Sequence, residues 1–130
     1  MPPKSKTNPT PAPVSSTEGA VLTKAIIRAA DRLGISQRML ANVLGVSEAV
    51  VSRMRKGDYV LERGKPFELA VLFVRLYRSL DAIVSGDDKT ASDWLKNDNL
   101  ALRGRPADLI QSVQGLVDVI RYLDSRRAVI

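Results

Sequence analysis

The 130-residue sequence contains neither cysteine nor histidine, and these two absences exclude much site chemistry. Zinc and iron–sulfur sites draw mainly on these residue types, and a Ser–His or Cys–His nucleophile pair requires histidine. Adjacent Asp87 and Asp88 do not converge on one substrate atom and fit a turn with a helix cap. The glycines form no phosphate-binding fingerprint. We therefore expect no enzyme activity, no metal and no cofactor.

Long apolar runs and convincing strands are also missing. No stretch approaches the roughly 20 apolar residues that a membrane-spanning helix needs, and the first sixteen residues lack the apolar segment of a signal peptide. The short run at 59–61 cannot support a sheet. At 45% hydrophobic residues the chain can still form a packed core. We therefore expect an all-α protein with no membrane partner. The absence of cysteine suits a reducing compartment, so we expect the protein in the cytoplasm.

Positive charge is distributed unevenly along the chain. The formal net charge is +6, with ten Lys/Arg and five Asp/Glu in residues 1–64 but ten and nine in residues 65–130. The excess in the first half suits a polyanionic partner such as nucleic acid. Solubility alone is the alternative explanation.

Capping residues predict three helices in the first half. A serine before a helix can accept a hydrogen bond from its first turn, and a glycine after it can adopt the left-handed conformation that ends it. The expected starts are Ser15 (with Glu18 as a capping box), Ser36 and Ser47, and the expected ends are Gly34, Gly45 and Gly57. Before them, residues 1–14 hold five of the seven prolines and predict a disordered arm.

Four further helices are expected in the second half. A long helix begins near Pro66, and its wide apolar stripe predicts burial on more than one side. After a turn at Gly86 comes a helix that carries Trp94, then a loop, a short helix from Pro106 and an apolar final helix. We divide the chain into the arm (1–14), a helix-turn-helix DNA-binding domain (15–64) and a second helical domain (65–130).

The helices capped by Ser36 and Ser47 form a helix-turn-helix, whose second helix enters the major groove by its N-terminal end. Helical spacing directs Val51 and Met54 toward the other helices and leaves the opposite face free for DNA. The predicted DNA-binding residues are Gln37, Ser47, Glu48, Ala49, Val50, Ser52, Arg53 and Lys56.

These residues differ in what they offer to DNA. Arg53 can pair bidentately with guanine, while Arg55 and Lys56 can neutralise phosphate. Gln37 begins a helix and can approach a phosphate. Glu48 can only accept hydrogen bonds, and Ala49 offers no more than contact with a thymine methyl group, so DNA shape would carry much of the specificity. The alternative is that the helices have become a scaffold without DNA binding.

Residues 36–57 follow the pattern S-Q-x-x-L-A-x-x-L-G-V-S-x-x-x-V-S-x-x-x-x-G. This pattern resembles the Xre/lambda-repressor type of helix-turn-helix over its whole length. One short recognition helix binds a half-site weakly, so we expect a homodimer, with the fourth and last helices as packing or dimer surfaces.

Residues 91–109 read A-S-D-W-L-K-N-D-N-L-A-L-R-G-R-P-A-D-L, and a glycine follows at the start of the final helix. This stretch resembles the toxin-binding domain of the Xre/MbcA/ParS antitoxins. The matching residues, in order, are Trp94, Leu95, Asn99, Leu102, Gly104, Pro106, Leu109, Gly115, Val119 and Leu123. The sequence departs from the family at Asp98, where a proline is usual, and in its short tail.

The resemblance implies an antitoxin of a type II toxin–antitoxin system. Its partner would be a RES/ParT-like toxin that acts on NAD or uses it for ADP-ribosylation. The antitoxin would cover the toxin's NAD pocket, and a higher-order complex would repress its own promoter. The residues that the resemblance nominates for toxin binding are Trp94, Asn99, Arg103, Arg105, Arg121, Tyr122, Arg126, Arg127 and Ile130.

Four of these residues have a simpler alternative explanation. Trp94 suits a core position, Asn99 suits a loop tie, and Arg126 and Arg127 suit the negative end of a helix dipole. The terminal carboxylate could also occupy an anion site of the toxin. Two other functions remain open: a transcription regulator whose second half only dimerises or senses a ligand, and an antitoxin that has lost DNA binding.

Overall fold

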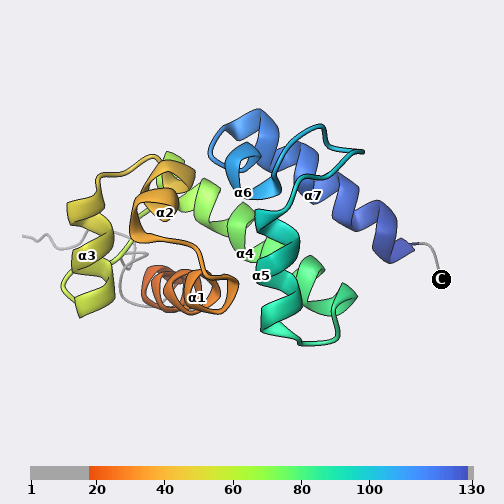
Figure 1. Cartoon of the computed structure of the whole chain (residues 1–130). Coiled ribbons are helices and arrows are strands. Elements are labelled where there is room, and N and C mark those ends of the chain that lie inside the picture. Colours follow the sequence, from red (N-terminus) through yellow and green to blue (C-terminus); the bar gives the residue numbers. More distant parts are fainter. Residues whose placement is uncertain (1–17, 129–130) are drawn as a thin grey trace, which may run out of the picture.

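The computed structural model describes residues 18–128, and within this range seven helices are joined by turns and loops (Figure 1). The helices are α1 (Glu18–Leu33), α2 (Gln37–Leu44), α3 (Glu48–Lys56), α4 (Lys65–Ile83), α5 (Asp88–Lys96), α6 (Pro106–Leu109) and α7 (Val113–Ala128). One isolated bridge joins Asn99 and Gly104. The all-α prediction is confirmed. The predicted arm, the cap at Ser15 and Ile130 lie outside the described residues.

The predicted caps of the short helices are confirmed. Ser36 Oγ accepts a hydrogen bond from the Met39 N–H at 3.1 Å, and Ser47 Oγ accepts one from the Val50 N–H at 3.2 Å. Gly45 and Gly57 follow α2 and α3 with φ of +72° and +84°, which L side chains rarely adopt. These caps fix where α3 starts and stops, and therefore which of its residues face outward.

The connector after α3 is tied to α1 by a buried polar contact. The Leu61 N–H donates to Thr23 Oγ1 at 3.0 Å, and both residues are buried. Thr23 Oγ1 in turn donates to the Gly19 carbonyl oxygen at 2.7 Å. Together with the buried Val51 and Met54 of α3, this contact fixes the helix-turn-helix against α1.

Helix α4 joins the two halves of the molecule. It packs against α1 and α2 and also against α5 and α7, as its wide apolar stripe predicts. At the end of α4, Ile83 is 41% exposed. The buried residues of α4 are Leu69, Ala70, Phe73, Leu76, Ser79 and Leu80. A single apolar core therefore runs on both sides of the predicted boundary at residues 64 and 65.

The second half depends on two local features. Asp87 Oδ1 accepts the Thr90 N–H at 3.1 Å and caps α5, and this hydrogen bond holds the pKa of the Asp87 carboxyl below its usual range. Gly115, in the first turn of α7, lies so close to the Leu109 carbonyl group that a Cβ atom would collide with it. Glycine is thus required where α7 crosses the end of α6. No helix among residues 18–128 has the length and apolar character needed to cross a membrane.

Candidate DNA-binding and partner-binding surfaces

The exposed face of α3 carries most of the predicted DNA-binding residues. Glu48, Ala49, Arg53 and Lys56 are exposed, and Val50 and Ser52 are partly buried beside them. The cap residue Ser47 is exposed, and Gln37 lies at the start of α2, where its Nε2 donates to the Glu48 carbonyl oxygen at 3.4 Å. The structure therefore brings all eight residues to α3 and its junction with α2.

Glu48 has a structural role at the start of α3. Its carboxylate lies 3.8 Å from Arg38 Nε, and it sits in the first turn, where a negative charge is favoured by the helix dipole. Both side chains are largely exposed, so the ion pair itself contributes little to stability. The presence of glutamate here is therefore explained without a base contact.

The basic residues of α3 differ in their surroundings. The Arg53 guanidinium lies 5.3 Å from the centroid of the Tyr59 ring, a cation–π contact that orients an otherwise exposed side chain. Arg55 forms an ion pair with Asp31 of α1 at 2.8 Å. Within residues 18–128, Lys56 makes no ion pair. Arg53 and Lys56 are thus the cations of α3 that form no ion pair within the described part of the chain.

Three predicted toxin-binding residues form a stack between α5 and α7. The rings of Trp94 and Tyr122 lie 6.2 Å apart at an interplanar angle of 16°, and the Arg126 guanidinium lies 5.8 Å from the Tyr122 centroid. They line a hollow of about 320 Å³ together with Leu80, Ile83, Val84, Thr90 and Leu123. Trp94 is only partly buried, so it both packs on the core and reaches the surface.

The loop between α5 and α6 is held by Asn99. Its Oδ1 accepts the Leu102 N–H at 3.0 Å, its N–H donates to the Gly104 carbonyl oxygen at 3.0 Å, and its carbonyl oxygen accepts the Arg103 N–H at 2.8 Å. Arg103 adopts a positive φ of +63°. These bonds fix the loop and present Leu100 to solvent with 96% of its surface exposed.

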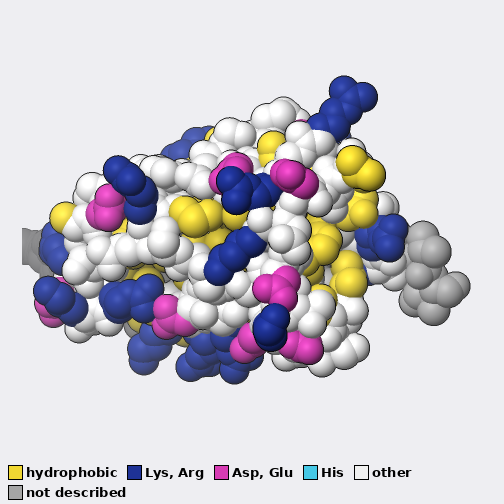
Figure 2. Space-filling view, in the orientation of Figure 1, with side chains coloured by type: hydrophobic (Ala, Val, Ile, Leu, Met, Phe, Trp, Pro, Cys, Tyr) yellow, Lys and Arg dark blue, Asp and Glu magenta, His cyan; other side chains and the backbone are white. Residues whose placement is uncertain are grey.

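Of the remaining predicted arginines, Arg103 and Arg105 lie in the loop before α6, and Arg121 lies on α7. Arg103, Arg105 and Arg121 are exposed, and Arg105 Nε lies 3.3 Å from Asp108 Oδ2. The loop tip and the C-terminal end of α7 both lie opposite the end that holds α3 (Figure 1). Hydrophobic side chains gather at the right-hand end of the same face in Figure 2, so apolar and cationic groups are combined there.

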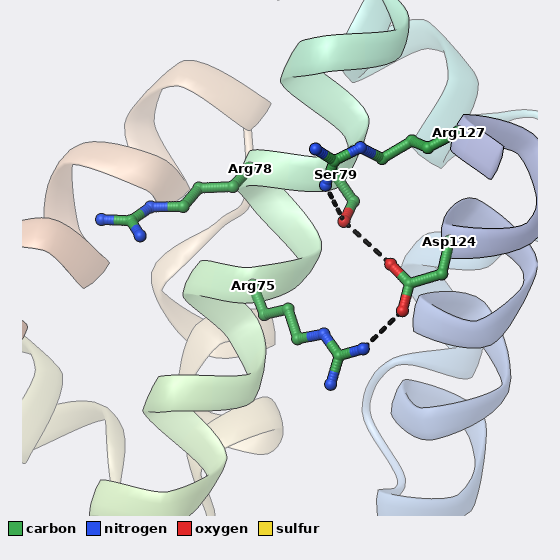
Figure 3. A pocket seen from close by; sticks show the side chains of 5 residues that line it. All are labelled: Arg75, Arg78, Ser79, Asp124 and Arg127. Carbon is green, nitrogen blue, oxygen red and sulfur yellow. Dashed lines mark hydrogen bonds and ion pairs between the residues drawn. The ribbon is translucent and has the colours of Figure 1, made fainter. Parts of the chain in front are cut away.

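Arg127 is separated from the other predicted toxin-binding residues. Its Nη1 donates to Ser79 Oγ at 3.1 Å, and Ser79 Oγ donates to Asp124 Oδ1 at 3.1 Å (Figure 3). Arg75 of α4 pairs with the other oxygen of Asp124. Ser79 is 1% exposed. Arg127 therefore faces α4 and helps to fasten the end of α7, whereas Tyr122 and Arg126 face α5.

Each half of the chain matches a known domain family. Residues 12–75 match the antitoxin Xre-like helix-turn-helix domain, and residues 79–128 match the antitoxin Xre/MbcA/ParS C-terminal toxin-binding domain. The chain belongs to the Xre/MbcA/ParS antitoxins. This confirms the resemblance carried by the two sequence patterns. A search of curated proteins gives no match to this antitoxin.

Sequence reasoning missed two residues of the antitoxin that the structure makes prominent. Leu100 stands next to the predicted Asn99, but no periodicity marks a loop leucine as exposed. The sequence does not mark Ser79, because its partners Asp124 and Arg127 are 45 and 48 residues away in the chain. The only available signal was a serine within the apolar stripe of α4, where an unpaired hydroxyl would be unfavourable.

Proposed function

We propose that this antitoxin neutralises an NAD-dependent toxin of the RES/ParT type by covering its active site with the end of the molecule that carries Leu100 and the Trp94–Tyr122–Arg126 stack. The observation that carries the proposal is the 96% exposure of Leu100 on a loop fixed by hydrogen bonds. Burial of a large apolar side chain in a partner contributes favourable binding free energy. Because the loop is already ordered, little conformational entropy is lost on binding.

The stack of Trp94, Tyr122 and Arg126 also suits binding to the toxin. Tyr and Trp, with Arg, are the residue types that most often dominate the energetics of protein interfaces. Here Arg126 covers one side of the stack, and the hollow next to it offers a place for a toxin side chain. Arg103, Arg105 and Arg121 add guanidinium groups that can pair with carboxylates of the toxin. The NAD chemistry belongs to the toxin and is inferred from the family resemblance.

The helix-turn-helix would bind the operator of the antitoxin's own operon. Arg53 is exposed, oriented by Tyr59 and placed on the outer face of α3, which supports a base contact in the major groove. Because a single short helix binds a half-site weakly, we propose that a homodimer or a larger complex with toxin represses transcription.

Coexpression with the neighbouring toxin gene tests the proposed function. The toxin is tagged, the antitoxin is left untagged, and both growth and copurification are measured. We expect the antitoxin to restore growth and to copurify with the toxin, whereas a Leu100→Ser/Arg126→Ala variant, which leaves the core intact, should do both less well. Absence of both rescue and copurification for the full chain would instead favour a regulator that uses the hollow at Trp94 for a ligand.

A further inference from the structure

Helix α1 exposes a row of cations on one side. Lys24, Arg28 and Arg32 follow one another at intervals of four residues, so they span about 12 Å along the helix. The same three residues line a hollow of about 570 Å³ together with Arg55 and Lys56, the last two residues of α3. Five cations from two helices thus surround one depression.

This basic surface continues beyond α3. Arg28 and Arg32 also line a second hollow, which Arg78 of α4 shares. Arg78 then lines the hollow of Figure 3 with Arg75 and Arg127. Because neighbouring hollows share residues, they form one continuous surface, which we call the cationic track. Its members are Lys24, Arg28, Arg32, Arg55, Lys56, Arg75, Arg78 and Arg127.

Much of the charge in the track is not neutralised. Asp31 pairs with Arg55, and Asp124 pairs with Arg75. In the part of the chain that the structure describes, no ion pair is formed by the four cations Lys24, Arg28, Lys56 and Arg78. Figure 2 shows Lys and Arg side chains gathered along the lower edge of the molecule, where Figure 1 places α1.

A phosphate backbone fits this surface better than a protein partner does. The centres of protein interfaces are depleted of charged residues, whereas clustered Lys and Arg on one face are typical of nucleic-acid binding. The track also begins at α3 itself. Nine residues of helix span about 13 Å, close to the roughly 12 Å width of the major groove. A helix that enters the groove by its N-terminus therefore brings Lys56 near the phosphates of the groove wall.

We propose that the cationic track binds the phosphate backbone of DNA beside the base pairs that α3 contacts. The inference rests on the proposed DNA binding and extends it to a surface outside the helix-turn-helix. Contacts to phosphate position the protein without reading sequence, and each one releases bound counterions. The track therefore supplies affinity that depends on salt and is equal for operator and unrelated DNA.

The test compares two double variants with the unchanged antitoxin. Lys24→Gln/Arg28→Gln removes two exposed cations from the track, and Lys89→Gln/Lys96→Gln removes two exposed cations of α5 that belong neither to the track nor to the proposed toxin-binding surface. Each protein is titrated over a series of KCl concentrations against the duplex upstream of its own gene and against an unrelated duplex of equal length.

We expect the track variant to bind both duplexes about tenfold more weakly at roughly 0.1 M salt, with the slope of log affinity against log salt reduced by about 1.8. The control variant should match the unchanged protein. Equal affinity and slope for the track variant would overturn the track while leaving DNA binding by α3 intact. If the unchanged antitoxin binds neither duplex, both the track and the proposed DNA binding are wrong.

Two further measurements test whether loss of stability or loss of toxin binding explains the behaviour of the track variant. Thermal unfolding of the track variant should match that of the unchanged antitoxin, and if it does not, Arg78→Gln on α4 provides the same comparison from a different helix. Capture by tagged toxin should also be unchanged. Loss of toxin capture with unaltered DNA binding would show that the track serves an acidic protein surface, which contradicts the proposal.

Discussion

The rings of Trp94 and Tyr122 lie nearly parallel, 6.2 Å apart, across the junction of α5 and α7. The two residues are 28 positions apart in the sequence, and both are only partly buried. Their contact therefore does two things at once. It packs α5 against α7, and it keeps aromatic surface available at the end of the molecule that we propose binds the toxin.

Replacement of Tyr122 by alanine should weaken toxin binding strongly. Truncation of an aromatic residue at the centre of an interface commonly loses 2 kcal/mol or more of binding free energy, so we expect the Kd to rise roughly thirtyfold. Tyr122→Phe keeps the ring and the stack and should bind the toxin almost normally. Calorimetric titration of purified toxin measures both, and equal affinity for the alanine variant would remove Tyr122 from the interface.

Substitution of Leu100 should affect toxin binding but not the stability of the antitoxin. Because the side chain is 96% exposed, Leu100→Ser should change the free energy of unfolding by less than about 0.5 kcal/mol. The same variant should bind toxin at least tenfold more weakly, since the side chain can be buried only in the complex. Val21→Ser is the matched control, because Val21 is also exposed but lies on α1. An equal effect of both substitutions on toxin affinity would contradict the assignment of the loop.

Arg126 and Arg127 are adjacent but should respond differently. Arg126→Ala removes the cation above Tyr122 and should lower toxin affinity without a change in the unfolding midpoint. Arg127→Ala removes a hydrogen bond to the buried Ser79 hydroxyl and should cost about 1 kcal/mol of stability with little effect on toxin affinity. Thermal unfolding and toxin titration of both variants check this, and the reverse pattern would mean that Arg127 is the contact residue.

Arg53 is the residue of α3 that we expect to discriminate between base pairs. Arg53→Ala should lower affinity for the operator by about 1–3 kcal/mol while affecting unrelated DNA less. Glu48→Gln removes a negative charge from the same face and should leave operator binding equal or stronger. Competition titrations with both duplexes distinguish them. Equal losses on both duplexes for Arg53→Ala would indicate a phosphate contact instead of a base contact.

Substitution of Gly115 by alanine tests the close packing of α7 against the end of α6. Alanine is normally favoured over glycine in a helix by nearly 1 kcal/mol, so a substitution governed by helix propensity would stabilise the protein. Gly115→Ala should instead destabilise it by about 1–3 kcal/mol or more, because the added Cβ collides with the Leu109 carbonyl group. Gln114→Ala, at the exposed neighbouring position, should cause little change. Chemical unfolding of both variants gives the comparison.

Much of the helical framework could be predicted from the sequence. The serine and glycine positions around α2 and α3 specify their ends through local hydrogen bonds and a left-handed backbone, and these depend on neighbouring residues alone. The same holds for the cap at Asp87 and the start of α6 at Pro106. Where local chemistry determines the structure, a single sequence is sufficient.

The site details depend on contacts between distant segments. Ser79, Asp124 and Arg127 come together only because α4 and α7 pack side by side. The cationic track likewise requires α1, α3, α4 and α7 to present their cations to one surface. The exposure of Leu100 follows from the hydrogen bonds of Asn99. The residue types at positions 99 and 100 do not by themselves predict those hydrogen bonds. Packing, not local preference, determines these features.

Consumption of NAD by the purified toxin, measured with and without antitoxin, shows whether the antitoxin covers the active site as proposed. Toxin alone is incubated with NAD, and loss of NAD is followed while antitoxin or its Leu100→Ser variant is added. We expect the unchanged antitoxin to stop NAD consumption, the variant to require a higher concentration, and excess NAD to compete with binding. A stable complex in which the toxin still consumes NAD at its full rate would show that the antitoxin does not cover the active site.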